Sequence, residues 1–189
     1  MNQQLVIKNL AGIFQKCPVE KIQIYDTNIT IIIKNSCLKN VLFFLKYHIL
    51  TQFKILTCIS SGDYPAKKYR FKIVYELLSI RFNTRLSVKI SVYELMHVDS
   101  CSSLYSSSSW YECEIWDMYG IFFKNHPNLK RIMTDYGFEG YPLRKDFPLS
   151  GFIETKYNET QKRVINEALE FSQEYRTFNF LSPWGDKVI

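Results

Sequence analysis

The sequence contains no two cysteines close enough together to begin a metal or iron–sulfur site. Its five cysteines are widely spaced and form no zinc-finger pattern with the histidines; they are Cys17, Cys37, Cys58, Cys101 and Cys113. Such sites usually begin with two cysteines a few residues apart. We therefore expect free, mostly buried thiols in a reducing compartment, and no cofactor or metal held by this chain.

Long apolar runs and targeting segments are also missing. The longest apolar run, from Val41 to Leu45, is far too short to cross a bilayer, so we expect no membrane span. Residues 1–5 show neither a secretory signal nor an Arg-rich presequence. This indicates a cytosolic protein, or one made inside an organelle without a transit peptide. The 20 Ile, 17 Lys and 11 Asn against only 3 Ala are typical of an AT-rich genome and agree with the organelle.

Acidic residues are fewer than basic ones. The 24 Lys and Arg outnumber the 18 Asp and Glu, which gives a formal net charge of +6. A basic protein can bind nucleic acid, anionic lipid or an acidic protein. Here the basic residues are scattered and interleaved with acids and apolar residues. We therefore expect protein partners rather than nucleic acid.

The spacing of the apolar residues predicts an α+β fold. The expected elements are, in order, a helix over 2–16, a hairpin over 22–33, a helix over 38–49, and strands at 53–60, 69–79 and 86–92. Ser36 is the expected cap of the second helix. A mixed or antiparallel sheet flanked by helices accounts for this order.

The second half of the chain is less regular. The serine-rich segment 100–109 fits a flexible linker, a polar loop or a short helix. Residues 152–167 fit a helix capped by Asn158 and Gln161, or two strands around a turn at those residues; for 167–175 we favour a helix. We expect a compact domain over 1–133, then an ordered loop and an extended, irregular C-terminal tail over 134–189 that lies on partner proteins.

The stretch from 110 to 151 concentrates the chemistry. Three acids, Glu112, Glu114 and Asp117, fall within six residues, and in a helix the last two share one face. Together with His126 they could bind a metal or perform acid–base catalysis. No nucleophile–base pair and no phosphate-binding glycine loop accompanies them.

A structural interpretation of the same stretch is favoured. In it the helix packs its aromatic and apolar residues inward, namely Trp110, Ile115, Trp116 and Tyr119. The acids pair with nearby bases, namely Lys130, Arg131, Arg144 and Lys145. Gly120 would end the helix in the left-handed region. His126 would bind backbone in a sharp turn, and residues 134–151 would form an ordered loop in which Arg144, Lys145 and Asp146 make ion pairs across an interface.

This stretch resembles the signature of the 30-kDa subunit of respiratory NADH:ubiquinone oxidoreductase, a family that is called subunit 9 when organelle-encoded and that has bacterial counterparts. The matching positions are Glu112, Glu114, Asp117, Met118, Tyr119, His126, Lys130, Ile132 and Met133. The segments 140–147, 181–184 and 70–85 are also similar to that family. One position departs: Cys113 stands where the family usually has Arg, so any ion pair of that Arg is lost or supplied by another residue.

The resemblance implies a non-catalytic structural and assembly subunit of the peripheral arm, in the quinone-reducing module, on the matrix side of the mitochondrial inner membrane. The implied partners are the 49-kDa-type subunit and neighbouring iron–sulfur subunits, and flavin and clusters are expected in those partners. The residues expected in ion pairs or interfaces are Glu112, Glu114, Asp117, His126, Lys130, Arg131, Arg144, Lys145, Asp146 and Trp184. Two alternatives stay open, namely a carboxylate–metal enzyme and a basic RNA-binding or ribosomal adaptor.

Overall fold

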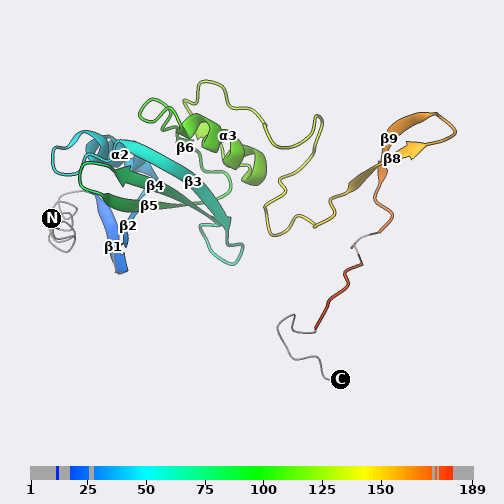
Figure 1. The fold of residues 1–189 in the computed structure, drawn as a ribbon, viewed down its shortest axis with the longest axis horizontal. Helices are drawn as coiled ribbons and strands as arrows, with labels where there is room; N and C mark the ends of the chain where they lie inside the picture. Colours follow the sequence, from blue (N-terminus) through cyan, green and yellow to red (C-terminus); the bar gives the residue numbers. More distant parts are fainter. Residues whose placement is uncertain (1–11, 13–17, 26–27, 172, 174, 181–189) are drawn as a thin grey trace, which may run out of the picture. The chain divides into compact units, whose positions relative to one another are not determined.

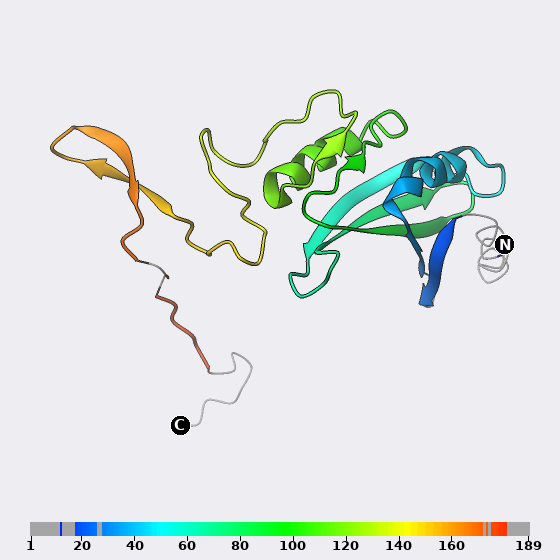
Figure 2. The same ribbon diagram turned by 180° about the vertical axis from the view of Figure 1, so that it is seen from behind.

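The computed structural model describes residues 12, 18–25, 28–171, 173 and 175–180 (Figures 1 and 2). The helix expected over 2–16, apart from Gly12, and the expected interface residue Trp184 lie outside this part of the chain. The described residues divide into two units, of which the first ends at Lys145 and the second begins at Asp146. None of the described helices is long and apolar enough to cross a membrane.

The first unit is built on a five-stranded mixed sheet with the strand order β1-β2-β5-β4-β3. Its strands are β1 (Val19–Tyr25), β2 (Asn28–Ile33), β3 (Ile55–Asp63), β4 (Phe71–Ser79) and β5 (Thr84–Val92). All neighbouring strands are antiparallel except β2 and β5, which are parallel. In β4 and β5 every second residue is buried, which is the pattern of strands with one face on a core. The predicted hairpin and strands, and with them the α+β fold class, are confirmed.

In the described part of this unit, the helices α2 (Leu38–Tyr47) and α3 (Ser108–Tyr119) complete the core. The first, α2, follows a 3-10 turn, η1 (Asn35–Cys37), and buries Leu38, Val41, Leu42 and Leu45. The expected cap at Ser36 is wrong, because Ser36 lies within the 3-10 turn and the residue before α2 is Cys37, whose side chain makes no capping bond. The second, α3, lies along β3 (Figure 1).

The serine-rich segment before α3 is ordered. It follows β6 (Val98–Asp99), which pairs in parallel with β7 (Phe123–Lys124). Ser100, Cys101 and Ser108 are buried, so the alternative of a flexible linker is wrong.

Hydroxyl groups from α3 bind the outer edge of the sheet at β3. Tyr111 Oη donates to the carbonyl of Thr57 at 2.9 Å, and Tyr119 Oη donates to the carbonyl of Ser61 at 2.7 Å. A free strand edge can pair with another chain. These contacts cover the β3 edge and fix α3 against it.

The second unit contains a hairpin of β8 (Ile153–Asn158) and β9 (Arg163–Ala168). Of the two alternatives for 152–167, the strands are correct. Asn158 does not cap a helix; its side-chain oxygen accepts the N–H groups of Thr160 and Gln161 in the turn. The helix favoured for 167–175 is wrong, because the N–H of Leu169 continues the hairpin by donating to the carbonyl of Phe152, and the described residues beyond it form no helix.

Candidate functional site

Helix α3 places its three acids in different surroundings. The side chains of Glu112 and Asp117 are fully buried, whereas Glu114 is exposed. We expected Glu114 and Asp117 on one face, but the helix buries Asp117 and turns Glu114 to solvent. Trp110, which we expected to pack inward, is 67% exposed, so that prediction is wrong.

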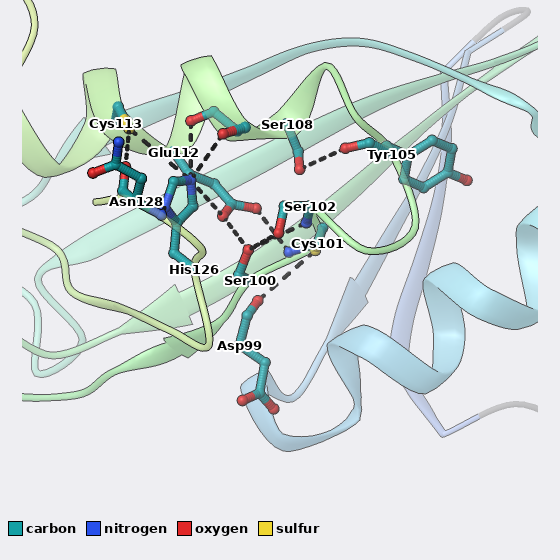
Figure 3. Close-up of polar contacts among 11 residues, drawn as sticks. Asp99, Ser100, Cys101, Ser102, Tyr105, Ser108, Glu112, Cys113, His126 and Asn128 are labelled. Atoms are coloured by element: carbon teal, nitrogen blue, oxygen red, sulfur yellow. Dashed lines mark hydrogen bonds and ion pairs between the residues drawn. The ribbon is translucent and has the colours of Figure 1, made fainter. Parts of the chain in front are cut away.

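Glu112 lies in a polar cluster beneath the start of α3 (Figure 3). Its Oε2 accepts from the hydroxyl of Ser100 at 2.6 Å, its Oε1 accepts from the backbone N–H of Cys101 at 2.8 Å, and His126 Nε2 lies 3.9 Å from Oε2. Burial raises the pKa of Glu112, and the hydrogen bonds and the nearby imidazole offset this only in part. The charged form of this carboxyl is therefore disfavoured relative to an exposed glutamate.

His126 joins the turn after β7 to α3. Its Nδ1 accepts from the backbone N–H of Asn128 at 3.1 Å, and its Nε2 lies 3.2 Å from the carbonyl of Ser109. Since a carbonyl only accepts, we assign the ring proton to Nε2. The expected turn, in which the imidazole binds backbone, is confirmed.

Cys113 occupies the neighbouring position. Its side chain is buried, and Sγ lies 3.5 Å from the carbonyl of Asn128 and 4.0 Å from His126 Nε2 (Figure 3). A thiol is a weak donor and carries no positive charge. The residue thus packs against the same turn that His126 organises.

Asp117 organises the loop that follows. Its Oδ2 accepts the backbone N–H groups of Ile132, Met133 and Thr134 at 3.2, 2.7 and 2.9 Å, and its Oδ1 accepts the hydroxyl of Thr134 at 2.7 Å. Arg131 Nη1 lies 3.5 Å from Oδ1, as expected for a paired acid. Burial by itself raises the pKa of Asp117, but these donors outweigh it and hold the pKa below its usual value. The charge is therefore favoured and binds the loop.

A third buried carboxylate, Asp63, stands at the end of β3. It accepts two hydrogen bonds from the guanidinium of Arg70, at 2.8 and 2.9 Å, and one from the backbone N–H of Lys145 at 2.8 Å. The hydrogen bonds from Arg70 hold the pKa of Asp63 below its usual value despite burial. This pair was not predicted from the sequence, although opposite charges at the two ends of a hairpin turn are a usable signal.

Arg144 fastens the loop before the second unit. Its Nε donates to the carbonyl of Tyr119 at 2.7 Å, and its guanidinium pairs with Glu94. The same guanidinium lies 4.5 Å from the centroid of the Tyr141 ring and 5.3 Å from that of Phe71. Residues 134–145 thus belong to the first unit, which ends at Lys145.

Gly120 makes room for this arrangement. It ends α3 with φ of 74°, so the predicted left-handed helix end is confirmed. A Cβ at this position would lie 2.6 Å from the Tyr141 ring and 2.7 Å from Arg144 Nη2. Both the backbone angle and the close approach require glycine here.

Two of the remaining predicted residues present their side chains to solvent. Lys130 and Lys145 are exposed, and Asp146 begins the second unit. Within the described ranges, no group of three or more His, Cys, Asp or Glu residues could hold a metal ion. Glu112 and His126 come together, but Asp117 faces its own loop and Glu114 faces solvent. The four residues of the metal-enzyme alternative therefore do not form one site.

Comparison with known proteins shows which family this chain is similar to. A family model described as "Respiratory-chain NADH dehydrogenase, 30 Kd subunit" matches residues 31–153. The "NADH-ubiquinone oxidoreductase subunit 9" of Prototheca wickerhamii is 52% identical over 147 residues, which cover 78% of this chain and 77% of that protein. The "NADH dehydrogenase [ubiquinone] iron-sulfur protein 3" of Solanum tuberosum is 48% identical over 163 residues, covering 86% and 83%.

A solved structure shares the fold. A chain of the membrane-bound sulfane sulfur reductase, described as an archaeal respiratory membrane complex, superposes with a TM-score of 0.66 and 21% identity over 76% of this chain and 85% of that one. At this identity the likeness extends to the fold alone. The family match and the two relatives go further: this chain belongs to the family of the 30-kDa subunit of respiratory-chain NADH dehydrogenase.

Proposed function

We propose that this chain is a structural and assembly subunit of respiratory NADH:ubiquinone oxidoreductase and carries no active site of its own. One observation carries the proposal: the buried acids Glu112, Asp117 and Asp63 are all bound by donors of this chain. Carboxylates engaged in this way order loops and have few free lone pairs for a substrate. They make a rigid surface from irregular backbone.

The loop that Asp117 fixes is suited to contact another protein. It presents Met133, Tyr136 and Leu143 with exposed fractions of 65%, 103% and 51%. Exposed apolar and aromatic side chains on a fixed backbone are typical interface anchors. We place the 49-kDa-type subunit and the neighbouring iron–sulfur subunits as the partners, with flavin and clusters held by those chains, on the matrix side of the mitochondrial inner membrane.

The second unit supports the same role. An isolated two-stranded hairpin is marginally stable in water. This one and the chain around it expose many large apolar side chains, namely Phe152, Ile153, Tyr157, Val164, Phe171, Tyr175, Phe178 and Phe180. We infer that the tail lies along partner subunits and is stabilised by them.

Deletion of the tail tests the proposal. A chain ending before Gly151 should fail to enter the assembled enzyme, measured by native gel and NADH dehydrogenase staining of organelle membranes. A matched control, Glu159→Gln in the exposed hairpin turn, should assemble normally. An enzyme that assembles fully with the shortened chain would refute the role of the tail. An altered rate in a fully assembled enzyme would instead indicate a direct catalytic contribution.

A further inference from the structure

The five-stranded sheet has a face that nothing in the described ranges covers. The helices α2 and α3 pack on the other face, where Leu42 and Ile115 share one core with Ile73 of β4. The alternate strand residues Val74 and Leu78 are only half-buried and lie outside that core. In the described ranges the helices thus cover one face of the sheet, and the opposite face carries the half-buried apolar residues Val74 and Leu78.

Three lysines gather on this face. Lys72 comes from β4, Lys89 lies directly opposite Val74 on β5, and Lys67 comes from the loop between β3 and β4. The Nζ atoms of Lys67 and Lys72 lie 4.8 and 5.0 Å from the centroid of the same ring, that of Tyr64. Two ammonium groups thus meet at one aromatic side chain.

The positive charges of these three lysines are not paired with carboxylates in the described part of the chain. No carboxylate of the described chain forms an ion pair with Lys67, Lys72 or Lys89, and Glu76, the acid of β4 on this face, instead accepts the hydroxyl of Ser87 at 2.9 and 2.8 Å. The adjacent Lys67 ammonium, burial, and the charges of Lys67 and Lys89 lower the pKa of Lys72. Like charges held close together are stabilised when an anion binds between them.

A hollow adjoins the lysines at one end of the face. Its volume is about 330 Å³; the apolar side chains that line it include Ile32, Tyr69 and Met96, and the polar ones include Ser91, Lys34 and Glu20. Ser91 pairs directly with Lys72 across β4 and β5. An apolar side chain in the hollow would therefore stand next to groups that bind carboxylates.

We propose that this sheet face, defined by Lys67, Lys72, Lys89 and the hollow at Ser91, binds an acidic segment of a partner protein. Carboxylates of that segment pair with the lysines, and an apolar side chain beside them fills the hollow. A protein fits better than a nucleic acid or a membrane, because Glu76, Val74 and Leu78 interrupt the face and would disfavour a continuous polyanion. The inference rests on the proposed role within an assembled enzyme.

Carbodiimide cross-linking of the purified, assembled enzyme tests the contact. The reagent joins a lysine Nζ to a carboxylate in direct contact with it. We expect mass spectrometry to find at least one of the three lysines coupled to Asp or Glu of another subunit. We also expect acetylation of the three to be at least about tenfold slower in the enzyme than in the isolated full chain, as an ion pair of modest strength would produce.

Charge reversal tests the same face in vivo. Lys72→Glu/Lys89→Glu should lower the amount of assembled enzyme about tenfold, whereas Lys54→Glu/Lys124→Glu, with the same charge change at exposed positions elsewhere, should leave it unchanged. The neutral variant Lys72→Gln/Lys89→Gln, checked for folding by circular dichroism of the isolated chain, should fall between them. Equal effects of the patch and control variants would overturn the proposal.

The remaining outcomes are decisive as well. Lysines that react equally fast in the enzyme and in the isolated chain would overturn the proposal. So would protection that disappears on nuclease treatment or delipidation without any cross-link to protein, since the occupant would then be nucleic acid or lipid. Absence of the chain from the purified enzyme would refute the proposed function itself, whereas free lysines in a chain that is present would refute this inference alone.

Discussion

Glu112 and Asp117 are both fully buried on α3, yet their surroundings act on them in opposite ways. Glu112 accepts one hydroxyl and one backbone N–H, and burial raises its pKa. Asp117 accepts three backbone N–H groups and one hydroxyl, with Arg131 alongside, and its pKa is lowered despite burial. Asp117 has more fixed donors than Glu112 and lies less deep in the protein, and both differences favour its anion.

The nature of the donors matters as much as their number. A backbone N–H group can only donate a hydrogen bond. The three that face Asp117 therefore require an acceptor oxygen, either of an anion or of a carbonyl group. The Ser100 hydroxyl at Glu112 can accept as well as donate, and Ser102 Oγ, at 2.9 Å, offers it an alternative acceptor. We therefore expect the loop at Asp117 to depend on charge, and the cluster at Glu112 to depend mainly on shape.

The largest effect should come from Asp117→Asn. The Asn carbonyl oxygen could still accept the three backbone N–H groups, but the amide NH2 would then face the Thr134 hydroxyl and the Arg131 guanidinium. The anion that these donors bind would be lost in a buried site, so the free energy of unfolding should fall by about 3 kcal/mol. Urea unfolding of the full chain measures this loss. A loss below that of an ordinary surface substitution would show that the donors do not depend on the charge.

Glu112→Gln should have a smaller effect. The Gln carbonyl can keep the N–H of Cys101, and the Ser100 hydroxyl can rotate to accept from the amide, so the free energy of unfolding should fall by about 1 kcal/mol. The same urea experiment gives the value. If Glu112→Gln cost as much as Asp117→Asn, the contrast between the two sites would be refuted.

The two acids should also differ in the sign of their pH dependence. The lowered pKa of Asp117 adds stability above its usual value of 3.8, and this is lost as the pH falls through the folded-state pKa. The raised pKa of Glu112 has the opposite sign: stability is gained as the pH falls through the folded-state pKa toward the usual 4.5.

Unfolding of the variants between about pH 7 and about pH 3 checks these signs. The deficit of Asp117→Asn relative to the natural chain should shrink on acidification, and the deficit of Glu112→Gln should grow. Parallel profiles for the two variants would contradict the opposite shifts.

The smallest effect belongs to Glu114→Gln on the exposed face of the same helix. It should change the free energy of unfolding by no more than about 0.5 kcal/mol, because it removes no buried hydrogen bond. This variant is the control for the two buried acids. A loss comparable to that of Glu112→Gln would mean that helix charge, rather than burial, governs all three.

The sequence predicted the elements whose pattern is local. Alternation in β4 and β5, the hairpin of β1 and β2, and the glycine end of α3 all follow from residue spacing. The wrong predictions were the cap at Ser36, the inward side chain of Trp110, the shared face of Glu114 and Asp117, and the helix over 167–175. In the last of these, a helical preference was overridden when the N–H of Leu169 extended the hairpin.

The sequence by itself determined the α+β class, the family, and the presence of acids in the helix and of bases in the segments that follow it. Tertiary structure alone decided which acid meets which donor. Asp63 and the N–H of Lys145 are 82 residues apart along the chain, and Glu112 is bound by Ser100 and Cys101 from a segment that fitted a linker as well as a loop. Such pairings depend on how strands and loops are brought together in space, and a period of two or 3.6 residues carries no information about that.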